Sequence, residues 1–251
     1  MMHKDDPARM SLNTLLKYAF SQPNTWGVQS EVHLDLGCGT NPRNPFQSKK
    51  VFGLDVIPEL DFKEFGIEYR LMGEGVKFPF ADNSIDSVSG FDFLEHLSRA
   101  FRGDLGTNEF IHCMNEVSRV LRPGGVALFV TPAFPGNMAF SDPTHLNFIT
   151  VDTVKYFVSN SDSVAAPATE MKYGYIGNLR LICQFWVYPP QLVYNSRILH
   201  DDINGSYRAN KLIKFYFKTL FRSPITIWNG FKKRSHLVWV LKKPTEVINI
   251  S

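Results

Sequence analysis

Short apolar runs alternate with segments of helical periodicity along the first half of the chain. The apolar runs have the length and composition of buried strands and lie at residues 32–37, 50–56, 68–73, 84–92 and 126–132. A helical apolar stripe covers residues 106–125 and stops where Pro123, Gly124 and Gly125 follow one another. Strands that alternate with helical segments predict an α/β fold with a doubly wound, parallel sheet.

The two ends of the chain depart from this alternation. Residues 11–22 have helical spacing and are followed by Pro23, which predicts a helix near the N-terminus. Residues 179–188 are strand-like, and a further strand lies close to the C-terminus. We predict a single domain over residues 1–251, made of a helical cap at 1–30, a sheet-forming core at 31–188, a basic aromatic insertion at 189–235 and a final strand at 236–243.

Composition limits the class of protein. The 251 residues, 44% of them hydrophobic, are enough for one large core. The N-terminal residues do not resemble a signal peptide, and no apolar run has the length of a spanning helix. The three cysteines lack the spacing of a metal or redox site. A cytoplasmic protein without a bound metal is therefore expected.

Basic residues are concentrated near the C-terminal end. Ten Lys or Arg and no Asp or Glu lie between Ile203 and Thr245, so the rest of the chain is acidic on balance. Within residues 208–223 the basic side chains fall on one helical face, and apolar side chains cover the remainder. This pattern fits a helix on the inner face of an anionic membrane, with residues 208–234 as a peripheral contact. A helix packed on the domain, or contact with an acidic glycan or RNA, fits it too.

The first predicted strand runs directly into the glycine-containing sequence Gly37-Cys38-Gly39. Glycines at the end of a strand allow backbone N–H groups to approach a ligand closely. Asp55 ends the second predicted strand, where a carboxylate accepts hydrogen bonds from ribose hydroxyls. A ribose-bearing ligand is therefore predicted at this edge. Asn41 and Pro42 follow the glycines, so the loop lacks the third glycine of a dinucleotide fingerprint, and there is no Walker lysine.

Five blocks of sequence resemble class I S-adenosylmethionine-dependent methyltransferases, of the type 11-like kind. They occur in the order "LDLGCGTNP", "GLDV", "GEGVKFPFADNSIDSV", "LEHL" and "EVSRVLRPGGVALFVTP", from about Val32 to Pro132, with further strands to about Lys243. The resemblance implies a Rossmann-like, mostly parallel sheet of seven strands, whose last strand is antiparallel and lies beside the fifth. It also implies S-adenosyl-L-methionine as the cofactor and S-adenosyl-L-homocysteine as the product.

The resemblance also implies which residues contact the cofactor. Glu74 stands where the family usually has Asp, and Asn41 replaces the third loop glycine found in many members. The implied contacts are Gly37, Cys38 and Gly39 at the methionine moiety with Asp35 supporting their loop, Asp55 and Val56 at the ribose, Glu74 and Gly75 at the adenine, and Phe91 near the sulfonium.

Methyl transfer requires an aligned acceptor, and a hydroxyl or amine acceptor also requires a group that removes its proton. "GFDFLEH" after the fourth predicted strand offers Asp92, Glu95 and His96, and "SDPTHLNFIT" after the fifth offers Asp142 and His145. Histidine titrates near neutral pH, so His145 and His96 are candidate catalytic bases, with Asp92 and Asp142 as candidate partners. Packing at a helix start is an equal alternative for His96, and capping a turn is the alternative for Asp142.

The block "SDPTHLNFIT" also resembles a loop of methyltransferases that modify bacterial polysaccharides, including O-antigen. This resemblance implies a sugar or glycan hydroxyl as the acceptor. The basic insertion suggests instead a small lipid-like or quinone-like acceptor at a membrane surface. An inactive cofactor-binding scaffold is the third hypothesis, and only Glu74 and Asn41 favour it. Nucleic acid is disfavoured as a substrate, because "FDFL" lacks the prolines of the exocyclic-amine methylases.

Overall fold

Seven of the described strands form one sheet, in which one strand runs opposite to the other six. This computed structural model describes residues 30–40, 42–57, 67–71, 77–104, 106–159, 164–187 and 235–245. Within these ranges seven strands pair in the order β3-β2-β1-β4-β7-β9-β8. Their bounds are Val32–Leu36 (β1), Lys50–Asp55 (β2), Ile67–Leu71 (β3), Ile85–Phe91 (β4), Leu121–Pro132 (β7), Arg180–Val187 (β8) and His236–Lys242 (β9).

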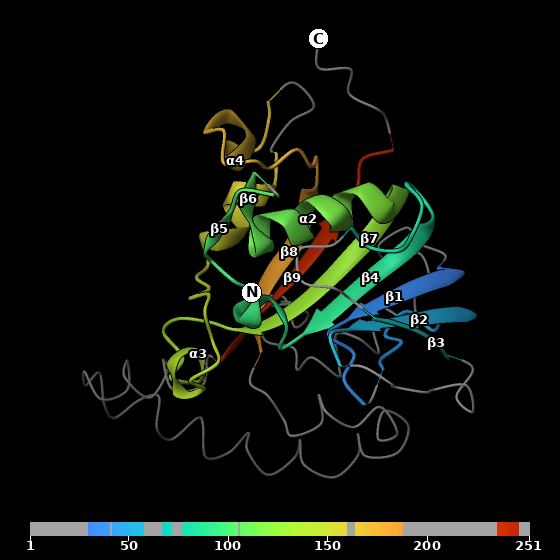
Figure 1. The fold of residues 1–251 in the computed structure, drawn as a ribbon, viewed down its shortest axis with the longest axis horizontal. Helices are drawn as coiled ribbons and strands as arrows, with labels where there is room; N and C mark the ends of the chain where they lie inside the picture. Colours follow the sequence, from blue (N-terminus) through green and yellow to red (C-terminus); the bar gives the residue numbers. More distant parts are fainter. Residues whose placement is uncertain are drawn as a thin grey trace, which may run out of the picture.

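The pairing confirms the predicted sheet. The pairs β2–β3, β1–β2, β1–β4 and β4–β7 are parallel, whereas β9 is antiparallel to both β7 and β8. The last strand, β9, therefore lies between β7 and β8 and runs opposite to both. It is the neighbour of the fifth predicted strand, β7 (Figure 1). The predicted N-terminal cap and the basic insertion lie outside the described residues, apart from Ser30 and Ser235. None of the helices in the described ranges is long and apolar enough to cross a membrane.

Helix α2, Glu109–Val120, crosses one face of the sheet (Figure 1). The side chain of Asn108 accepts a hydrogen bond from the Ile111 N–H and so caps the first turn. The helix is shorter than the stripe over residues 106–125 predicts. Pro123 favours an extended backbone before it, and Leu121 pairs with Ile85 as the start of β7.

Short elements complete the described fold. A two-stranded antiparallel ribbon precedes α2, and single turns of helix follow β4 and β7. They are β5 (Phe101–Arg102), β6 (Thr107–Asn108), the 3₁₀ turns η3 (Leu94–His96) and η4 (Thr153–Phe157), α3 (Met138–Ser141) and α4 (Pro167–Glu170).

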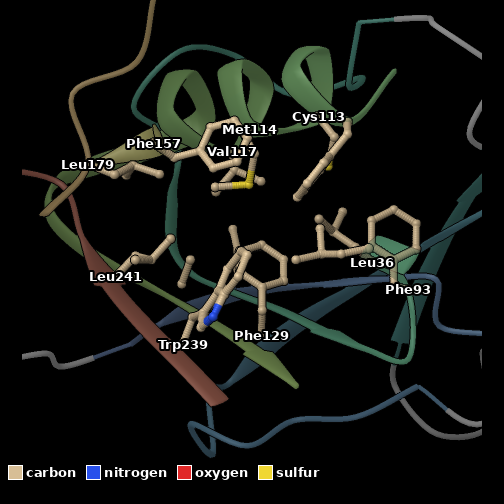
Figure 2. Packing of buried hydrophobic residues seen from close by; sticks show 14 of the residues in the cluster. Leu36, Phe93, Cys113, Met114, Val117, Phe129, Phe157, Leu179, Trp239 and Leu241 are labelled. Carbon is tan, nitrogen blue, oxygen red and sulfur yellow. The ribbon is translucent and has the colours of Figure 1, made fainter. Parts of the chain in front are cut away.

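The main core lies between α2 and the sheet (Figure 2). Met114 and Val117 point from the helix toward Phe129 and Trp239 of the central strands, and all four are fully buried. Each such side chain contributes about 1.5–3 kcal/mol by leaving water. A smaller cluster of Phe91, Leu128, Val130, Phe185, Val238 and Val240 forms a separate core. These apolar contacts fix the positions of the strand ends.

The carboxyl ends of β1, β2, β4 and β7 meet at one edge of the sheet, because these strands are parallel. Helix α3 lies near the end of β7 (Figure 1). Strand order reverses between β1 and β4, and open α/β sheets bind ligands beside such a switch point.

Candidate active site

The glycine loop, residues 37–39, turns away from β1 in a conformation that glycine adopts without strain. Gly37 and Gly39 have φ angles of 61° and 51°, in the left-handed region. The Gly37 N–H donates to the Leu54 carbonyl at 2.8 Å. A Cβ atom on Gly37 would lie 2.6 Å from Cδ2 of the buried Phe93 ring. Gly37 is therefore required both by its backbone angle and by the ring beside it.

Cys38 contributes backbone to this loop, and its thiol packs inward. The side chain is buried, and a Cβ atom on Gly53 would lie 2.8 Å from its Sγ atom. Burial raises the pKa of the Cys38 thiol well above its usual range. The thiol is therefore a packing group against β2.

Asp35 supports the loop from below. One carboxylate oxygen accepts the Arg43 N–H at 2.8 Å, and the other accepts the Ser89 hydroxyl at 2.5 Å. Burial raises the pKa of Asp35 to about 6, and the Arg43 charge opposes this shift. These contacts join β1, β4 and the segment after the loop, as its predicted supporting role requires.

Asp55 ties the glycine loop to the end of β2. One oxygen accepts the Gly39 N–H at 2.7 Å, and the other accepts the N–H groups of Val56 at 2.7 Å and Ile57 at 3.2 Å. Backbone donors thus fix the orientation of the Asp55 carboxylate, the group predicted to bind a ribose. Val56 and Ile57 are 53% and 43% exposed, so apolar side chains stand beside the carboxylate.

The remaining predicted cofactor contacts are Glu74, Gly75 and Phe91, and the structure describes only Phe91. Glu74 and Gly75 lie outside the described residues. The Phe91 ring is buried in the smaller core, with the Arg43 guanidinium 4.5 Å from its centroid. Its packing explains its apolar character, and its contact with the sulfonium stays a prediction.

Glu95 is a buried carboxyl group that follows β4. One oxygen accepts the Thr131 hydroxyl at 2.9 Å, and no other described group hydrogen-bonds to the second oxygen, Oε1. Loss of solvation raises the pKa of Glu95 to about 8, and the nearby charges of Asp92 and Asp142 act in the same direction. Glu95 therefore holds its proton near neutral pH in the absence of a cation.

His96 and His145 lie beside this carboxyl group, and we refer to Glu95, His96 and His145 as the histidine cluster. The two rings meet edge to face with centroids 4.8 Å apart. The Nε2 atom of His145 is 4.0 Å from Glu95 Oε1 and 3.9 Å from Asp142 Oδ2. The structure thus brings together the predicted bases His145 and His96 with Asp142.

Hydrogen bonds around the cluster assign the ring tautomers. The Nδ1 atom of His145 is 3.3 Å from the Ala139 carbonyl, which can only accept. Thr144 donates its hydroxyl to Asp142 at 2.6 Å, so its oxygen accepts from His96 Nδ1 at 3.1 Å. In each neutral ring Nε2 then carries the lone pair.

Asn147, which the sequence did not single out, holds the cluster together. Its side-chain amide donates to the carbonyls of Leu94 and Leu97 at 3.0 and 2.6 Å. The backbone N–H groups of Leu146 and Asn147 donate to the Glu95 carbonyl at 2.7 and 2.8 Å. These bonds join the segment after β7 to the turn after β4. A polar residue inside the apolar run "LNFI" was the only sequence signal.

Asp92 lies in a different group from the other predicted catalytic residues. Its φ angle is 48°, and its carboxylate contacts Nε2 of His236 at 3.0 Å. The Nδ1 atom of His236 is 3.0 Å from the Ser235 hydroxyl. Asp92 therefore joins β4 to the start of β9. The sequence did not identify His236, because it reads as the first residue of an apolar strand.

The part of the chain from β1 to β7 matches the sequence model of a known family. Residues 34–129 match the family model described as a methyltransferase domain. Residues 34–129 of this chain therefore form a methyltransferase domain, and the described sheet has the fold of S-adenosylmethionine-dependent methyltransferases. S-adenosylmethionine is the cofactor of this methyltransferase domain, and the glycine loop and Asp55 are the described residues that fit it.

A curated relative and two solved structures are similar to this chain. The demethylmenaquinone methyltransferase of Staphylococcus haemolyticus (strain JCSC1435) is 26% identical over 159 residues, which cover 55% of this chain and 61% of that relative. A SAM-dependent methyltransferase from Archaeoglobus fulgidus is 15% identical with a TM-score of 0.52, over 94% of this chain and 96% of that chain. The [4+2]-cyclase SpnF is 14% identical with a TM-score of 0.51, over 96% and 86%. Such likeness shows the fold and leaves the reaction open.

The methyltransferase domain exposes aromatic side chains on the segment that also carries His145. Phe134, Phe140 and Phe148, the aromatic trio, are each about half exposed, at 55%, 53% and 50%. The Phe140 ring contacts the other two, with centroids 6.3 and 5.1 Å apart. The trio lies on the segment after β7 that also carries Asp142 and His145.

Two of the cavities that the described residues line lie at different places on the methyltransferase domain. One of about 600 Å³ is lined by Asp82, Pro123 and Lys243, which lie near the start of β4 and β7, at the edge opposite the glycine loop. The other, of about 460 Å³, is lined by Phe148 and by Asn147, whose backbone N–H donates to the Glu95 carbonyl. Its position at the carboxyl-end edge makes the second cavity the better candidate for substrate contact.

Proposed function

We propose that this chain transfers the methyl group of S-adenosylmethionine to a hydroxyl group of an acceptor with an apolar or ring-shaped body. The observation that carries the proposal is the placement of His145 against His96 and Glu95, at the sheet edge that also holds the glycine loop. A methyl donor and a proton-accepting group at one edge are what O-methylation needs.

The cofactor side of the proposed reaction is a matter of holding and orienting. Backbone N–H groups of the glycine loop and the Asp55 carboxylate would fix the amino-acid and ribose parts of the cofactor. Exposed Val56 and Ile57 would pack against a flat base. The bound cofactor supplies an activated methyl group, so the chain needs no strong acid at this end.

The acceptor side requires removal of a proton. His145 would present Nε2 to the acceptor hydroxyl, because its Nδ1 faces the Ala139 carbonyl. Thr144 and Asp142 would hold the His96 ring beside it. His145 is then the base that takes the proton, and His96 orients the hydroxyl.

The aromatic trio favours a lipid-like or quinone-like acceptor. Three half-exposed phenylalanine rings form an apolar surface on the segment that carries His145. The name of the Staphylococcus haemolyticus relative, a demethylmenaquinone methyltransferase, points in the same direction. The peripheral membrane contact through residues 208–234 would suit such an acceptor, and these residues lie outside the described ranges.

A sugar or glycan hydroxyl is the second candidate acceptor. Its support is the resemblance of "SDPTHLNFIT" to a loop of polysaccharide methyltransferases. The same segment carries His145, which lies in the histidine cluster. Aromatic side chains also provide flat apolar surfaces that a sugar ring can contact. The inactive scaffold would instead bind the cofactor and transfer nothing.

The test is methyl transfer from labelled S-adenosylmethionine into fractions of the source cell. Lipid, quinone, polysaccharide, nucleic acid, protein and small-molecule fractions would be compared, with an Asp55→Ala protein as the control. Label in the lipid or quinone fraction supports the first candidate, and label in polysaccharide or sugar nucleotides supports the second. A purified protein that binds neither S-adenosylmethionine nor S-adenosylhomocysteine would overturn the proposal, and binding without any transfer would favour the scaffold.

A further inference from the structure

We propose that the histidine cluster is a binding site for one divalent transition-metal ion, with Zn²⁺ as the representative ligand. Glu95, His96 and His145 each offer one ligand atom, and these atoms all lie within 4.8 Å of one another. Two imidazoles and one carboxylate are a ligand set that suits Zn²⁺ and related divalent ions, with positions left open for water or substrate.

The spacing of the three ligand atoms is close to that of a metal-bound set. Ligands at about 2.0–2.2 Å from one ion lie roughly 3–3.5 Å apart. The Nε2 atom of His145 is 4.0 Å from Glu95 Oε1, so a small contraction brings this pair into range. His96 is exposed, which leaves its ring room to turn toward the other two.

The buried oxygen of Glu95 points to a missing ligand. The side chain is 1% exposed, and Oε1 has no hydrogen-bond partner among the described groups, whereas the other oxygen accepts the Thr131 hydroxyl. A buried carboxyl oxygen without a partner is costly, and a cation next to it would stabilise the ionised carboxylate. His145 Nε2 is the ligand-type atom that faces this same oxygen.

Hydrogen bonds behind the cluster have the arrangement that metal sites use to orient histidine. In such sites the ring nitrogen away from the metal donates to a carbonyl, a carboxylate or another acceptor. His145 Nδ1 faces the Ala139 carbonyl at 3.3 Å. His96 Nδ1 faces the Thr144 hydroxyl, which in turn donates to Asp142. In both rings the lone pair that can bind a metal therefore lies on Nε2.

A bound ion would change how the proposed reaction removes its proton, and this part of the inference rests on the proposed function. A metal-bound hydroxyl has a lowered pKa, so it can lose its proton without a histidine base. The acceptor O–H proton would pass to Asp142 or to water. The new O–CH₃ bond would form as the S–CH₃ bond of the donor breaks, and neutral S-adenosylhomocysteine would leave. His145 would then be a metal ligand, and Asp142 Oδ2, at 3.9 Å from its Nε2, would face the open side.

The experiment is a titration of the chelator-treated full chain with Co²⁺, followed by its visible absorption, and by competition with Zn²⁺. Glu95→Gln and His145→Gln remove one ligand each, and His112→Gln is the matched control, since His112 is outside the cluster. We expect one Co²⁺ per chain, displaced by Zn²⁺, with affinity at least about tenfold weaker in both cluster variants. His112→Gln should bind as the unsubstituted chain does.

Two further measurements keep the interpretation clear. Far-UV circular dichroism of each variant shows that it is folded, and S-adenosylhomocysteine affinity shows that the glycine loop is intact. Equal Co²⁺ affinity in the unsubstituted chain and in the two cluster variants overturns the metal site. If methyl transfer then still depends on His145, the proposed function stands with His145 as base. If the ion binds at the cluster but no fraction is methylated, the metal site stands and the proposed function fails.

Discussion

The glycine loop and the histidine cluster lie at the same edge of the sheet but are held in different ways. Gly39 is bound to Asp55, which is 16 residues away in the sequence. The cluster instead depends on Asn147, which binds carbonyls 53 and 50 residues away. In the proposed function, cofactor binding would depend on the bond between Gly39, which follows β1, and Asp55 of the adjacent strand β2, and acceptor chemistry would depend on how two distant segments dock. Mutations should therefore separate the two functions.

The largest effect is expected at the glycine loop. Gly37→Ala places a Cβ atom 2.6 Å from the Phe93 ring, at a φ of 61°. Strain of about 1–2 kcal/mol and overpacking of about 1–3 kcal/mol should weaken S-adenosylhomocysteine binding at least tenfold and lower the melting temperature. Calorimetric titration and thermal unfolding measure both quantities.

Gly39→Ala is the matched control for this change. It has a similar φ of 51°, but a Cβ atom there meets nothing within 4 Å. Only the backbone strain of about 1–2 kcal/mol applies, so its effect should be clearly smaller. Equal losses of affinity and melting temperature in the two variants would mean that the contact with Phe93 does not contribute to the effect of Gly37→Ala.

The next effect is expected at the join between the two segments. Asn147→Ala removes the donor to two carbonyls, which should cost about 1–3 kcal/mol for each group left buried without a partner. Methyl transfer should fall strongly while S-adenosylhomocysteine affinity changes little. Initial rates with labelled cofactor and a binding titration measure the two outcomes.

Asn115→Ala provides a control of the same chemistry elsewhere. Its side chain joins α2 to Gly174 and Ile176, away from the site. It should lower stability comparably and leave the specific activity of the folded protein unchanged. A parallel loss of activity in both variants would show that stability, and not the position of His145, controls the rate.

Glu95 should make stability depend on pH in the chelator-treated protein. Burial raises its pKa from 4.5 to about 8, so the unfolded chain loses this proton at lower pH than the folded chain. The stabilising contribution is complete below pH 4.5 and is lost as pH rises toward about 8, by at most about 1.4 kcal/mol per pH unit. Glu95→Gln should flatten this part of the profile.

Denaturant unfolding at several pH values between 5 and 9 measures this slope. The control is Glu31→Gln, a side chain that is 56% exposed and pairs with Lys49 at the surface. Its profile should follow that of the unsubstituted chain. A flat profile in the unsubstituted chain would contradict the raised pKa of Glu95.

The smallest effect on stability is expected in the aromatic trio. Phe140→Ala removes a ring that is 53% exposed, so unfolding should change by less than about 1 kcal/mol. For an apolar acceptor the KM should rise several-fold, because the ring would pack against it, and the KM for the cofactor should stay the same. Phe101→Ala, at 72% exposure in β5, should alter neither constant. Equal effects on both substrates would contradict an acceptor role for the trio.

The direction of the last strand was implied by the resemblance to a family. The sequence by itself determined the strands of the main sheet and the position of the glycine loop next to Asp55. Each depends on neighbouring residues, since strand patterning, a glycine turn and an acid at a strand end are local features. The helix over residues 106–125 was too long, because pairing of Leu121 with Ile85 across the sheet decides where it ends.

Only the tertiary structure decided which of the candidate catalytic residues lie together. Asp92 pairs with His236, 144 residues away, while Glu95, three positions after Asp92, faces His145. The hydrogen bonds of Asn147 decide that docking, and no local periodicity encodes them. Contacts over such separations form only when strands and loops close around one core, so the sequence could name His96 and His145 but could not show them in contact.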